Sequence, residues 1–398
     1  MAELSALRVD RAATGDLLVW CWERGSAALV LPEDAPTPVI RSLLERLAPA
    51  ALVELGADGR PTITRLDDPA PVDDEVALVV PTSGSTGVPK GVELGHAAVH
   101  ASVQASLERL GAQPGERWGL ALPTHHVAGI SVHLRAAALG TRAVVAADTA
   151  AVADLDVEHV ALVPSQLDRL LQQGAPVHRF ATILLGGAAA PEGLLDRAAA
   201  AGARVVRSYG MTETVGGCVY DGVPLRDVEV AISDPDGLIA LRGPVLLHGY
   251  RARDDQGRLG SWCPLDADGW LTTSDRGRLT DGRLEVLGRI DEVLVSGGEN
   301  VPLAAVLQRL LTHPGVADAA VVAVADPRWG QVPAAVVVPT DPTSPPSLDE
   351  LRAHVRRLAP AAYAPASLVV VAELPRDAMG KASRERLEQL VLTAHRSR

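Results

Sequence analysis

The sequence has few cysteines, few large aromatic side chains and no excess of positive charge. Its 398 residues include three Cys, one Phe and four Tyr, and the formal net charge is -12. Cys21, Cys218 and Cys263 lie far apart in the sequence, which argues against a zinc knuckle or a disulfide framework and favours a reducing cytoplasm. The acidic balance argues against non-specific binding to nucleic acid or anionic membranes, which requires clustered Lys and Arg.

Long hydrophobic runs are also missing. No stretch of about 18 uncharged apolar residues occurs, so no membrane span is expected. Residues 1–20 contain acidic side chains and lack the apolar core of a signal peptide. The length suggests two or three domains with a sizeable core. Because the chain has no excess of positive charge, a polyanionic ligand must be held locally, by backbone NH groups and a few placed cations.

Strands and helices alternate through the first half of the chain. Strands are predicted at residues 76–81, 160–163 and 182–185, and helices at residues 96–110, 165–173 and 191–201, the last with Pro191 at its start. Such alternation predicts parallel sheets covered by helices on both faces. Between residues 228 and 287, short strands separated by Asp, Gly and Pro turns predict a small β-rich, barrel-like subdomain.

The C-terminal part of the chain has a different pattern, which predicts a small α+β domain. Helices are expected at residues 301–312 and 348–358, and strands at residues 318–325, 334–338 and 367–371. Ser347 and Glu350 have the spacing of a capping box. The predicted fold class is therefore α/β, with a large N-terminal domain of mixed or parallel sheets at residues 1–290 and the α+β domain at residues 291–398.

A glycine-rich loop, TSGSTGVPKG, follows the first of these strands. Its glycines permit unusual φ angles and its hydroxyls add hydrogen-bond donors, a composition typical of phosphate-binding loops. It is not a Walker loop, because Lys90 is followed by Gly91 instead of Ser or Thr. A flexible surface loop is the alternative. The candidate phosphate-binding residues are Thr82, Ser83, Gly84, Ser85, Thr86, Gly87 and Lys90.

This loop resembles the phosphate-binding signature of the adenylate-forming enzymes, and further motifs of that superfamily follow in order. SYGMTET (residues 208–214) is similar to its adenine and magnesium motif, since Tyr209 can stack on a base, Thr212 can donate to a phosphate and Glu213 can bind Mg²⁺. LLGGA (residues 184–188) is similar to the segment that lies against adenine. TSD (residues 273–275) places Asp275 for the ribose. The resemblance extends the ATP-binding set to Gly187, Ala188, Ser208, Tyr209, Gly210, Asp275 and Arg289.

The resemblance also implies a reaction in two halves. A carboxylate attacks the α-phosphate of ATP, and a thiol, here that of coenzyme A, then displaces AMP. Lys381, in PRDAMGK, would serve the first half, together with Thr212, Glu213 and Mg²⁺. His126, in PTHHVAG, matches the histidine between acyl pocket and thiol tunnel, and its neighbour His125 suggests a metal site only weakly. The mobile C-terminal domain would turn at the hinge Asp291 and bring Gly297 and Gly298 to the coenzyme A.

Three further segments, TETVGGCVYDGVPLRDVEV, LPTHHVAGISVHLRAAALG and LVPSQLDRLL, resemble the 2-succinylbenzoate–CoA ligases of menaquinone synthesis. The second carboxylate of that acid needs a cation, and Arg135 and Arg169 are the candidates. Either could instead be an ordinary exposed helix arginine. Gly216 and Gly217 would leave room for the aryl ring. About 80 residues precede the phosphate loop, fewer than is common in the superfamily, which bears on oligomer contacts; a homodimer is one assembly it allows.

Three other functions remain open from the sequence. One is a CoA ligase for another small aryl or keto acid, for which Arg135 and Arg169 would be dispensable. Another is an adenylation module that loads a carrier protein. The last is a noncatalytic nucleotide sensor, which would be expected to lack Lys381 or Glu213, although both are present.

The role of Lys381 can be tested by Lys381→Ala. We expect loss of adenylation, because the cation at the α-phosphate is gone, while transfer from a supplied acyl-adenylate to coenzyme A continues. Separate assays of pyrophosphate exchange and of thioester formation from the adenylate would check this. If both half reactions survive, the assigned role is wrong.

Overall fold

The computed structural model describes residues 1–83, 89–191, 193–233, 235–254, 256–290, 293–296, 299–376 and 382–396. The chain forms two compact units. The larger comprises Met1–Ala231, Ala240–Thr272 and Leu279–Leu284, and the smaller comprises Ile232–Ile239, Thr273–Arg278 and Glu285–Arg398. The boundary predicted after residue 290 adjoins residues 291–292, which lie outside the described ranges, and it stays a prediction. Among the helices described, none is long and apolar enough to cross a membrane.

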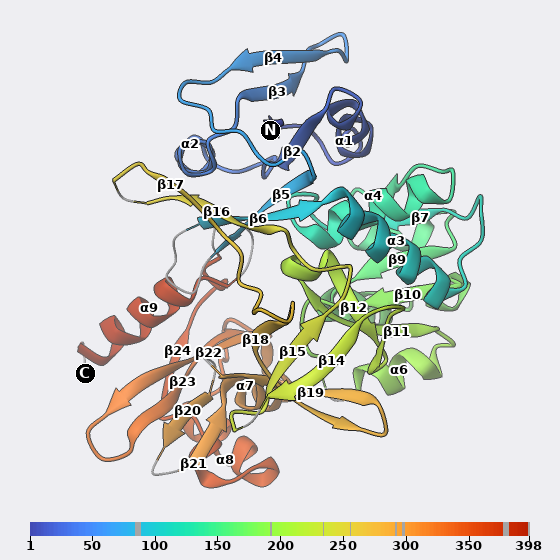
Figure 1. The fold of residues 1–398 in the computed structure, drawn as a ribbon. Coiled ribbons are helices and arrows are strands. Elements are labelled where there is room, and N and C mark those ends of the chain that lie inside the picture. Colours follow the sequence, from blue (N-terminus) through green and yellow to red (C-terminus); the bar gives the residue numbers. More distant parts are fainter. Residues whose placement is uncertain are drawn as a thin grey trace. The chain divides into compact units, whose positions relative to one another are not determined.

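The first large sheet of the larger unit has eight strands in the order β17-β16-β6-β5-β2-β1-β3-β4 (Figure 1). The strands β1, β2, β3 and β5 pair in parallel, and the outer pairings are antiparallel. The strands are β1 (Glu3–Leu7), β2 (Ser26–Val30), β3 (Ala51–Leu55), β4 (Pro61–Arg65), β5 (Val76–Ser83), β6 (Pro89–Gly95), β16 (Gly249–Arg253) and β17 (Leu259–Trp262).

One face of this sheet is covered by helix α2 (Thr37–Leu47). The helix buries Ile40, Leu43 and Leu47, whose spacing places them on one side of it. They pack against strand residues such as Leu29 and Val79. The other helices near the two large sheets are α1 (Thr14–Trp22), α3 (His96–Leu110), α4 (Val127–Ala138), α5 (Pro164–Gln172) and α6 (Leu194–Ala200).

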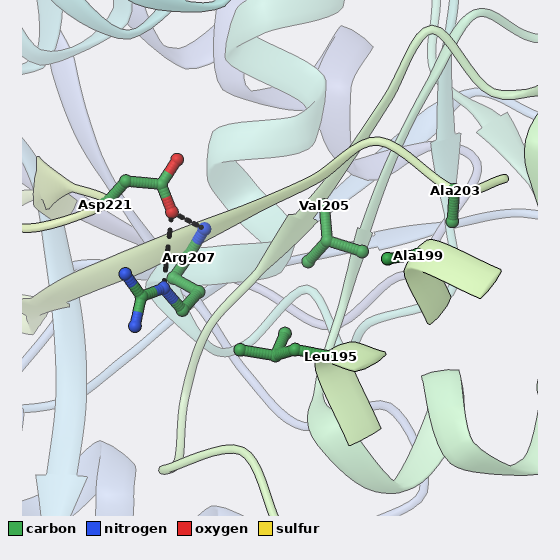
Figure 2. Close-up of a pocket in the computed structure, with 6 residues that line it drawn as sticks. All are labelled: Leu195, Ala199, Ala203, Val205, Arg207 and Asp221. Carbon is green, nitrogen blue, oxygen red and sulfur yellow. Dashed lines mark hydrogen bonds and ion pairs between the residues drawn. The ribbon is translucent and has the colours of Figure 1, made fainter. Parts of the chain in front are cut away.

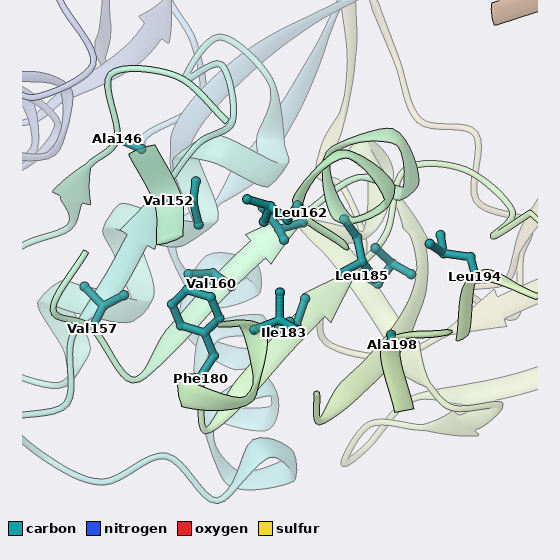
Figure 3. Close-up of a cluster of buried hydrophobic side chains, with 13 residues drawn as sticks. Ala146, Val152, Val157, Val160, Leu162, Phe180, Ile183, Leu185, Leu194 and Ala198 are labelled. Atoms are coloured by element: carbon teal, nitrogen blue, oxygen red, sulfur yellow. The ribbon is translucent and has the colours of Figure 1, made fainter. Parts of the chain in front are cut away.

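The second large sheet has seven strands in the order β13-β12-β11-β10-β9-β7-β8. Figure 3 shows its core, a cluster in which side chains of β9, β10 and α6 are buried together with Phe180, the only Phe of the chain. The strands are β7 (Trp118–Leu120), β8 (Val144–Val145), β9 (His159–Leu162), β10 (Thr182–Leu185), β11 (Val205–Met211), β12 (Gly216–Tyr220) and β13 (Val223–Pro224). Short 3₁₀ turns are η1 (Ala150–Asp154), η2 (Val177–Arg179) and η3 (Thr212–Thr214).

The predicted β-rich segment forms a four-stranded sheet in the order β14-β15-β18-β19. Its strands are β14 (Glu229–Ser233), β15 (Leu238–Arg242), β18 (Leu271–Thr280) and β19 (Arg283–Arg289). The last sheet has the order β21-β20-β23-β22, with β24 paired to β23 in parallel. Its strands are β20 (Val293–Ser296), β21 (Glu299–Pro302), β22 (Val316–Asp326), β23 (Gly330–Pro339) and β24 (Ser367–Val370).

The last sheet is covered on both faces. Alternate residues of β23 belong to two hydrophobic clusters, with Val337 on the side of α7 and α8 and Val336 on the side of α9. The elements are α7 (Leu303–Leu311), α8 (Leu348–Leu358), η5 (Ala361–Tyr363) and α9 (Arg384–Arg396). The capping box at the start of α8 is confirmed, because Ser347 N donates to Glu350 Oε2 over 2.8 Å and Glu350 N donates to Ser347 Oγ over 3.3 Å.

Most predicted elements are present. The helix at residues 96–110, the strand at 182–185 and the helix at 348–358 have the predicted bounds. The helix predicted to begin at Pro191 begins at Leu194 instead. Leu194 N donates to Pro191 O across a turn, and Gly193 has φ 73°, a left-handed conformation that cannot continue a helix.

The pairing of β6 with β16 buries an ion pair. Gly249 is paired with Glu93 and Arg251 with Gly91, so the Glu93 and Arg251 side chains lie diagonally on one face of the two strands. Arg251 Nη1 lies 3.3 Å from Glu93 Oε1, with exposures of 1 % and 6 %. Its Nη2 donates to Ala70 O over 3.0 Å. Gly91 leaves the necessary space, because a Cβ there would lie 3.1 Å from Arg251 Cγ and 2.6 Å from Val79 Cγ1.

This pair generates a stability prediction. Arg251→Met leaves Glu93 buried without its countercharge, so the free energy of unfolding should fall by about 3–5 kcal/mol. The double variant Arg251→Met/Glu93→Leu removes both charges and should recover most of that loss. Denaturant unfolding of both variants measures it, with Arg258→Met, in an exposed pair, as the control. Equal losses in single and double variants would contradict the assignment.

Candidate active site

The turn TET (η3) follows the end of β11. Thr214 organises it, since its Oγ1 accepts a hydrogen bond from Met211 N over 2.9 Å. Val215 follows with φ 54°, a left-handed conformation that is strained for a β-branched residue. Its carbonyl accepts hydrogen bonds from Ser131 Oγ at 3.3 Å and Ser102 Oγ at 3.5 Å. Packing and hydrogen bonds therefore hold this turn, and with it Glu213, in one conformation.

Glu213 lies in a three-residue cluster with Lys90 and Tyr250. Tyr250 Oη donates to Glu213 Oε1 over 2.7 Å, and Lys90 Nζ lies 3.9 Å from the same oxygen. The ammonium also lies 3.4 Å from the centroid of the Tyr250 ring, which is a close cation–π contact. The predicted phosphate-binding lysine and the predicted magnesium ligand are thus brought together by a third residue. Sequence reasoning missed Tyr250, although it is one of only four tyrosines.

The cluster is partly desolvated. Burial lowers the pKa of Lys90, and the charge of Glu213 opposes that shift. Burial, followed by the charge of Glu213, raises the pKa of Tyr250, so its hydroxyl stays protonated and remains a donor. The side chains of Lys90 and Glu213 are 27 % and 15 % exposed, which leaves both accessible to a small ligand.

The residues present fit magnesium with a triphosphate. Glu213 supplies a hard carboxylate oxygen, the ligand type that Mg²⁺ takes, usually through one or two protein carboxylates plus phosphate oxygens. Within the described part of the chain, no hydrogen bond reaches its second oxygen, Oε2. Lys90 supplies a compact cation for phosphate. Thr82 lies beside it, paired across β5 and β6, and its Oγ1 donates to Lys90 O over 3.4 Å.

His126 is the N-cap residue of α4, and its ring lies 4.4 Å from that of His125. Gly129 permits this arrangement, because a Cβ there would overlap the carbonyl of Pro123. In the described ranges, no three potential metal ligands among His, Cys, Asp and Glu cluster together. The weak metal interpretation of the two histidines therefore finds no structural support there.

Arg135 and Arg169 differ in surroundings. Arg135, on α4, is 3 % exposed, and its Nε donates to Ser106 Oγ over 2.9 Å. Its Nη2 lies 3.4 Å from Tyr220 Oη, and its guanidinium lies 5.2 Å from the Trp118 ring centroid. The hydrogen-bond partners found for it in the described residues are therefore neutral hydroxyls. Arg169 is exposed on α5.

The strands β11 and β12 bring together Ser208, Tyr209, Gly210, Gly216 and Gly217. A Cβ at Gly210 would overlap the Gly216 carbonyl, and a Cβ at Gly217 would overlap Ser208 Oγ, so these glycines allow two strands to approach closely. The space beside Gly217 is filled by protein. Beside Gly216 a Cβ would meet only Ser131 Oγ, at 3.5 Å.

Two other predicted segments are partly described. Gly187 follows β10 and has φ 84°, with Val163 Cγ1 at 3.2 Å from the position of a Cβ; Ala188 lies beyond it. In the smaller unit, Arg289 Nη1 lies 3.6 Å from Asp275 Oδ1, which joins the two predicted ribose residues.

The remaining predicted positions lie partly or wholly outside the described residues. The backbone of Ser83 is described as part of β5 but its side chain is not. The positions outside the described residues are Gly84, Ser85, Thr86, Gly87, Asp291, Gly297, Gly298 and Lys381.

A separate small cavity lies between α6 and β11 (Figure 2). Its volume is about 150 Å³, below the roughly 300 Å³ at which ligand pockets begin. Leu195, Ala199, Ala203 and Val205 line it, and Arg207 and Asp221 form an ion pair of 3.3 Å at its edge. None of the predicted site residues lines it, so we assign it no role.

Comparison with known proteins identifies the family of the chain. Residues 17–251 match the family model described as AMP-binding enzyme, and residues 308–381 match the AMP-binding enzyme C-terminal domain. The chain is 40% identical over 383 residues to a probable 2-succinylbenzoate–CoA ligase of Mycobacterium tuberculosis, with 90% of this chain and 97% of the relative covered. It is 34% identical over 345 residues to a 2-succinylbenzoate–CoA ligase of Bacillus velezensis, with 80% and 69% covered.

Solved structures that resemble the chain include enzymes that act on the same acid as these sequence relatives. The o-succinylbenzoate coenzyme A synthetase of Bacillus subtilis, in complex with its acyl-adenylate intermediate, matches with a TM-score of 0.83 and 27% identity over 97% of this chain and 88% of that chain. The same enzyme with ATP and magnesium ion has a TM-score of 0.83 and 27% identity, with 97% and 89% covered. The predicted fold class is confirmed by these matches.

The arrangement around Lys90 generates a binding prediction. We expect Lys90→Met to weaken ATP binding about tenfold or more, because a charge-assisted phosphate contact is lost. AMP binding should be unchanged, since AMP lacks the outer phosphates. Titration calorimetry with each nucleotide checks this, and Lys90→Arg should retain part of the ATP affinity. Equal loss for ATP and AMP would contradict a contact to the outer phosphates.

Proposed function

The chain belongs to the AMP-binding enzyme family, and we propose that it acts as an ATP-dependent 2-succinylbenzoate–CoA ligase in menaquinone synthesis. The proposal rests on the sequence relatives and, in the structure, on one observation above others. A cation, Arg135, is buried with neutral partners on α4, the helix whose N-cap residue is His126. Buried charges are usually paired, so a buried guanidinium with neutral partners is suited to an anionic ligand. The second carboxylate of succinylbenzoate is such an anion.

The chain's own residues would divide the work of the first half reaction. Lys90 and the loop from Thr82 would hold the outer phosphates, and Glu213 would hold the magnesium ion. When bound, Mg²⁺ neutralises phosphate charge and orients the triphosphate. Thr212 would donate to a phosphate and Lys381 would lie at the α-phosphate. Because two anions must meet, positioning and charge compensation are the main contributions to rate.

The adenosine would be held by a second group of residues. Tyr209 offers an aromatic face to the base, and Gly187 and Ala188 allow close approach of the backbone. Asp275 and Arg289 would bind the ribose. After adenylation, the domain at residues 291–398 would turn about Asp291, withdraw Lys381 and present Gly297 and Gly298 to coenzyme A. His126 would then separate the acyl and thiol sites.

Substrate selection is assigned mainly to Arg135. Its Nε and Nη2 donate to the hydroxyls of Ser106 and Tyr220, which lie 2.7 Å apart and orient the guanidinium. Arg169 is exposed and is the second candidate. Gly216, where a Cβ would meet only Ser131 Oγ at 3.5 Å, would border the aryl ring. The acid, ATP and coenzyme A are the partners, the cytoplasm is the proposed location, and a homodimer is the proposed assembly.

The deciding experiment is pyrophosphate release with ATP and Mg²⁺, with and without coenzyme A. The acids are 2-succinylbenzoate, benzoate, succinate, a medium-chain fatty acid and the amino acids. We expect selective turnover of succinylbenzoate and formation of its thioester. Turnover of benzoate alone would retain the family and reject the substrate, and thioester formation only on a carrier protein would favour the loading module. If protein that binds ATP released no pyrophosphate with any of these acids, the noncatalytic nucleotide sensor would be favoured.

Arg135→Met, measured in the same assay, tests whether Arg135 binds the second carboxylate of succinylbenzoate. The KM for succinylbenzoate should rise at least tenfold, as expected when a charge-assisted hydrogen bond is removed, with the KM for ATP unchanged. The fold should persist, because Ser106 and Tyr220 remain bonded to each other. Arg169→Met is the matched control, and a larger effect there would transfer the role to Arg169.

A further inference from the structure

We propose that Tyr250 is a positioning residue that holds Glu213 and Lys90 at the correct separation for a magnesium-bound triphosphate. The inference rests on the proposed use of ATP but not on the identity of the acid. Tyr250 comes from β16, 160 positions after Lys90 in the chain, and touches both charged groups.

The strand register explains how Tyr250 reaches Lys90. Tyr250 is paired with Val92 of β6, so Lys90, two residues earlier, is its diagonal neighbour on the same face. Diagonal neighbours on antiparallel strands lie within reach of an aromatic ring and a long side chain. The ring accordingly lies under the ammonium at 3.4 Å. On the opposite face, the same pairing buries Arg251 and Glu93, which fixes the register against slippage.

Glu213 is held by the same segment at two points. Leu247 N donates to the Glu213 carbonyl over 2.8 Å, and Tyr250 Oη donates to the Glu213 carboxylate over 2.7 Å. Tyr250 itself is 8 % exposed and packs against Trp262 of β17, with ring centroids 5.4 Å apart. Main chain and side chain of Glu213 are therefore both fixed to the segment that contains Leu247 and Tyr250.

Tyr250 contacts both Lys90 and Glu213, which would otherwise be free to form a close ion pair. Lys90 and Glu213 have opposite charges. A close direct ion pair between them would leave neither group available to bind a ligand. Tyr250 instead gives each of these two charged side chains a neutral interaction partner. Its hydroxyl donates to the carboxylate, and the negative face of its ring attracts the ammonium. The two charges stay 3.9 Å apart at their closest atoms, so the carboxylate can bind a metal while the ammonium binds phosphate.

The test separates metal-dependent from metal-independent nucleotide binding in the full-length protein. Titration calorimetry measures the Kd of ATP in saturating Mg²⁺ and in EDTA, and the Kd of AMP in EDTA. Tyr250→Phe removes only the hydroxyl, Tyr250→Leu removes the hydroxyl and the ring, and Trp262→Leu is the control that alters the other neighbour of the ring. Thermal unfolding of each variant reports whether the fold is retained.

We expect Tyr250→Phe to weaken ATP binding in Mg²⁺ about tenfold or more, the usual effect of removing a group that orients a metal ligand. Its ATP affinity in EDTA should stay within about twofold, because Lys90 keeps the ring. Tyr250→Leu should also weaken ATP binding in EDTA, by about threefold or more, with AMP binding unchanged. Trp262→Leu should leave all three constants unchanged.

Wild-type affinity in Tyr250→Phe with Mg²⁺ would overturn the inference, and so would an equal loss for ATP and AMP in Tyr250→Leu, which indicates general damage. These outcomes differ from failure of the proposed function. Wild-type protein that binds magnesium-ATP but converts no acid would reject the ligase proposal and leave the role of Tyr250 supported or refuted by its variants. Wild-type protein that does not bind magnesium-ATP would reject both.

Discussion

The antiparallel pairing of β6 with β16 is the interaction on which the candidate site depends. It joins the strand that follows the phosphate loop to a segment more than 150 positions later, and it places a different pair of side chains on each face. One face carries the buried ion pair of Glu93 and Arg251, and the other carries Lys90 beside Tyr250. A slip of β16 by one residue would move Arg251 to the face of Lys90 and Tyr250 to the face of Glu93. The stability of the core and the geometry of the site therefore depend on the same strand register.

The second constraint is the turn after β11. Val215 adopts a left-handed conformation that costs about 1–2 kcal/mol for a residue with a Cβ, and two serine hydroxyls from α3 and α4 bond its carbonyl. The helix that carries Arg135 and the helix that bonds it through Ser106 thus also fix the turn that carries Glu213. The residues proposed to bind the acid and the metal are therefore connected through these two helices.

Sequence reasoning predicted the elements whose signals are local. The helix α8 has a capping box, α3 is bounded by glycines, and β10 is a short apolar run, and all three have the predicted bounds. The motifs also named Lys90 and Glu213, which the structure brings together, and their roles stay predictions. Tyr250 was not predicted because its proposed role arises from strand register between distant segments, which a local sequence pattern does not encode. The start of α6 was misplaced because Gly193, in a left-handed conformation, separates Pro191 from the helix.

The two cations of the site have a common design. Lys90 faces an aromatic ring and a carboxylate 3.9 Å away, and Arg135 is bonded to two hydroxyls near an indole ring. Neither has a close bidentate carboxylate, although such pairs would stabilise a buried cation more strongly. The rings and hydroxyls beside them orient each cation without cancelling its charge, so the desolvation cost remains partly uncompensated until an anion binds. The dianionic acid and the triphosphate are anions of this kind. In the proposed function, part of the cost of holding each cation in the protein is thereby returned as selectivity for its ligand.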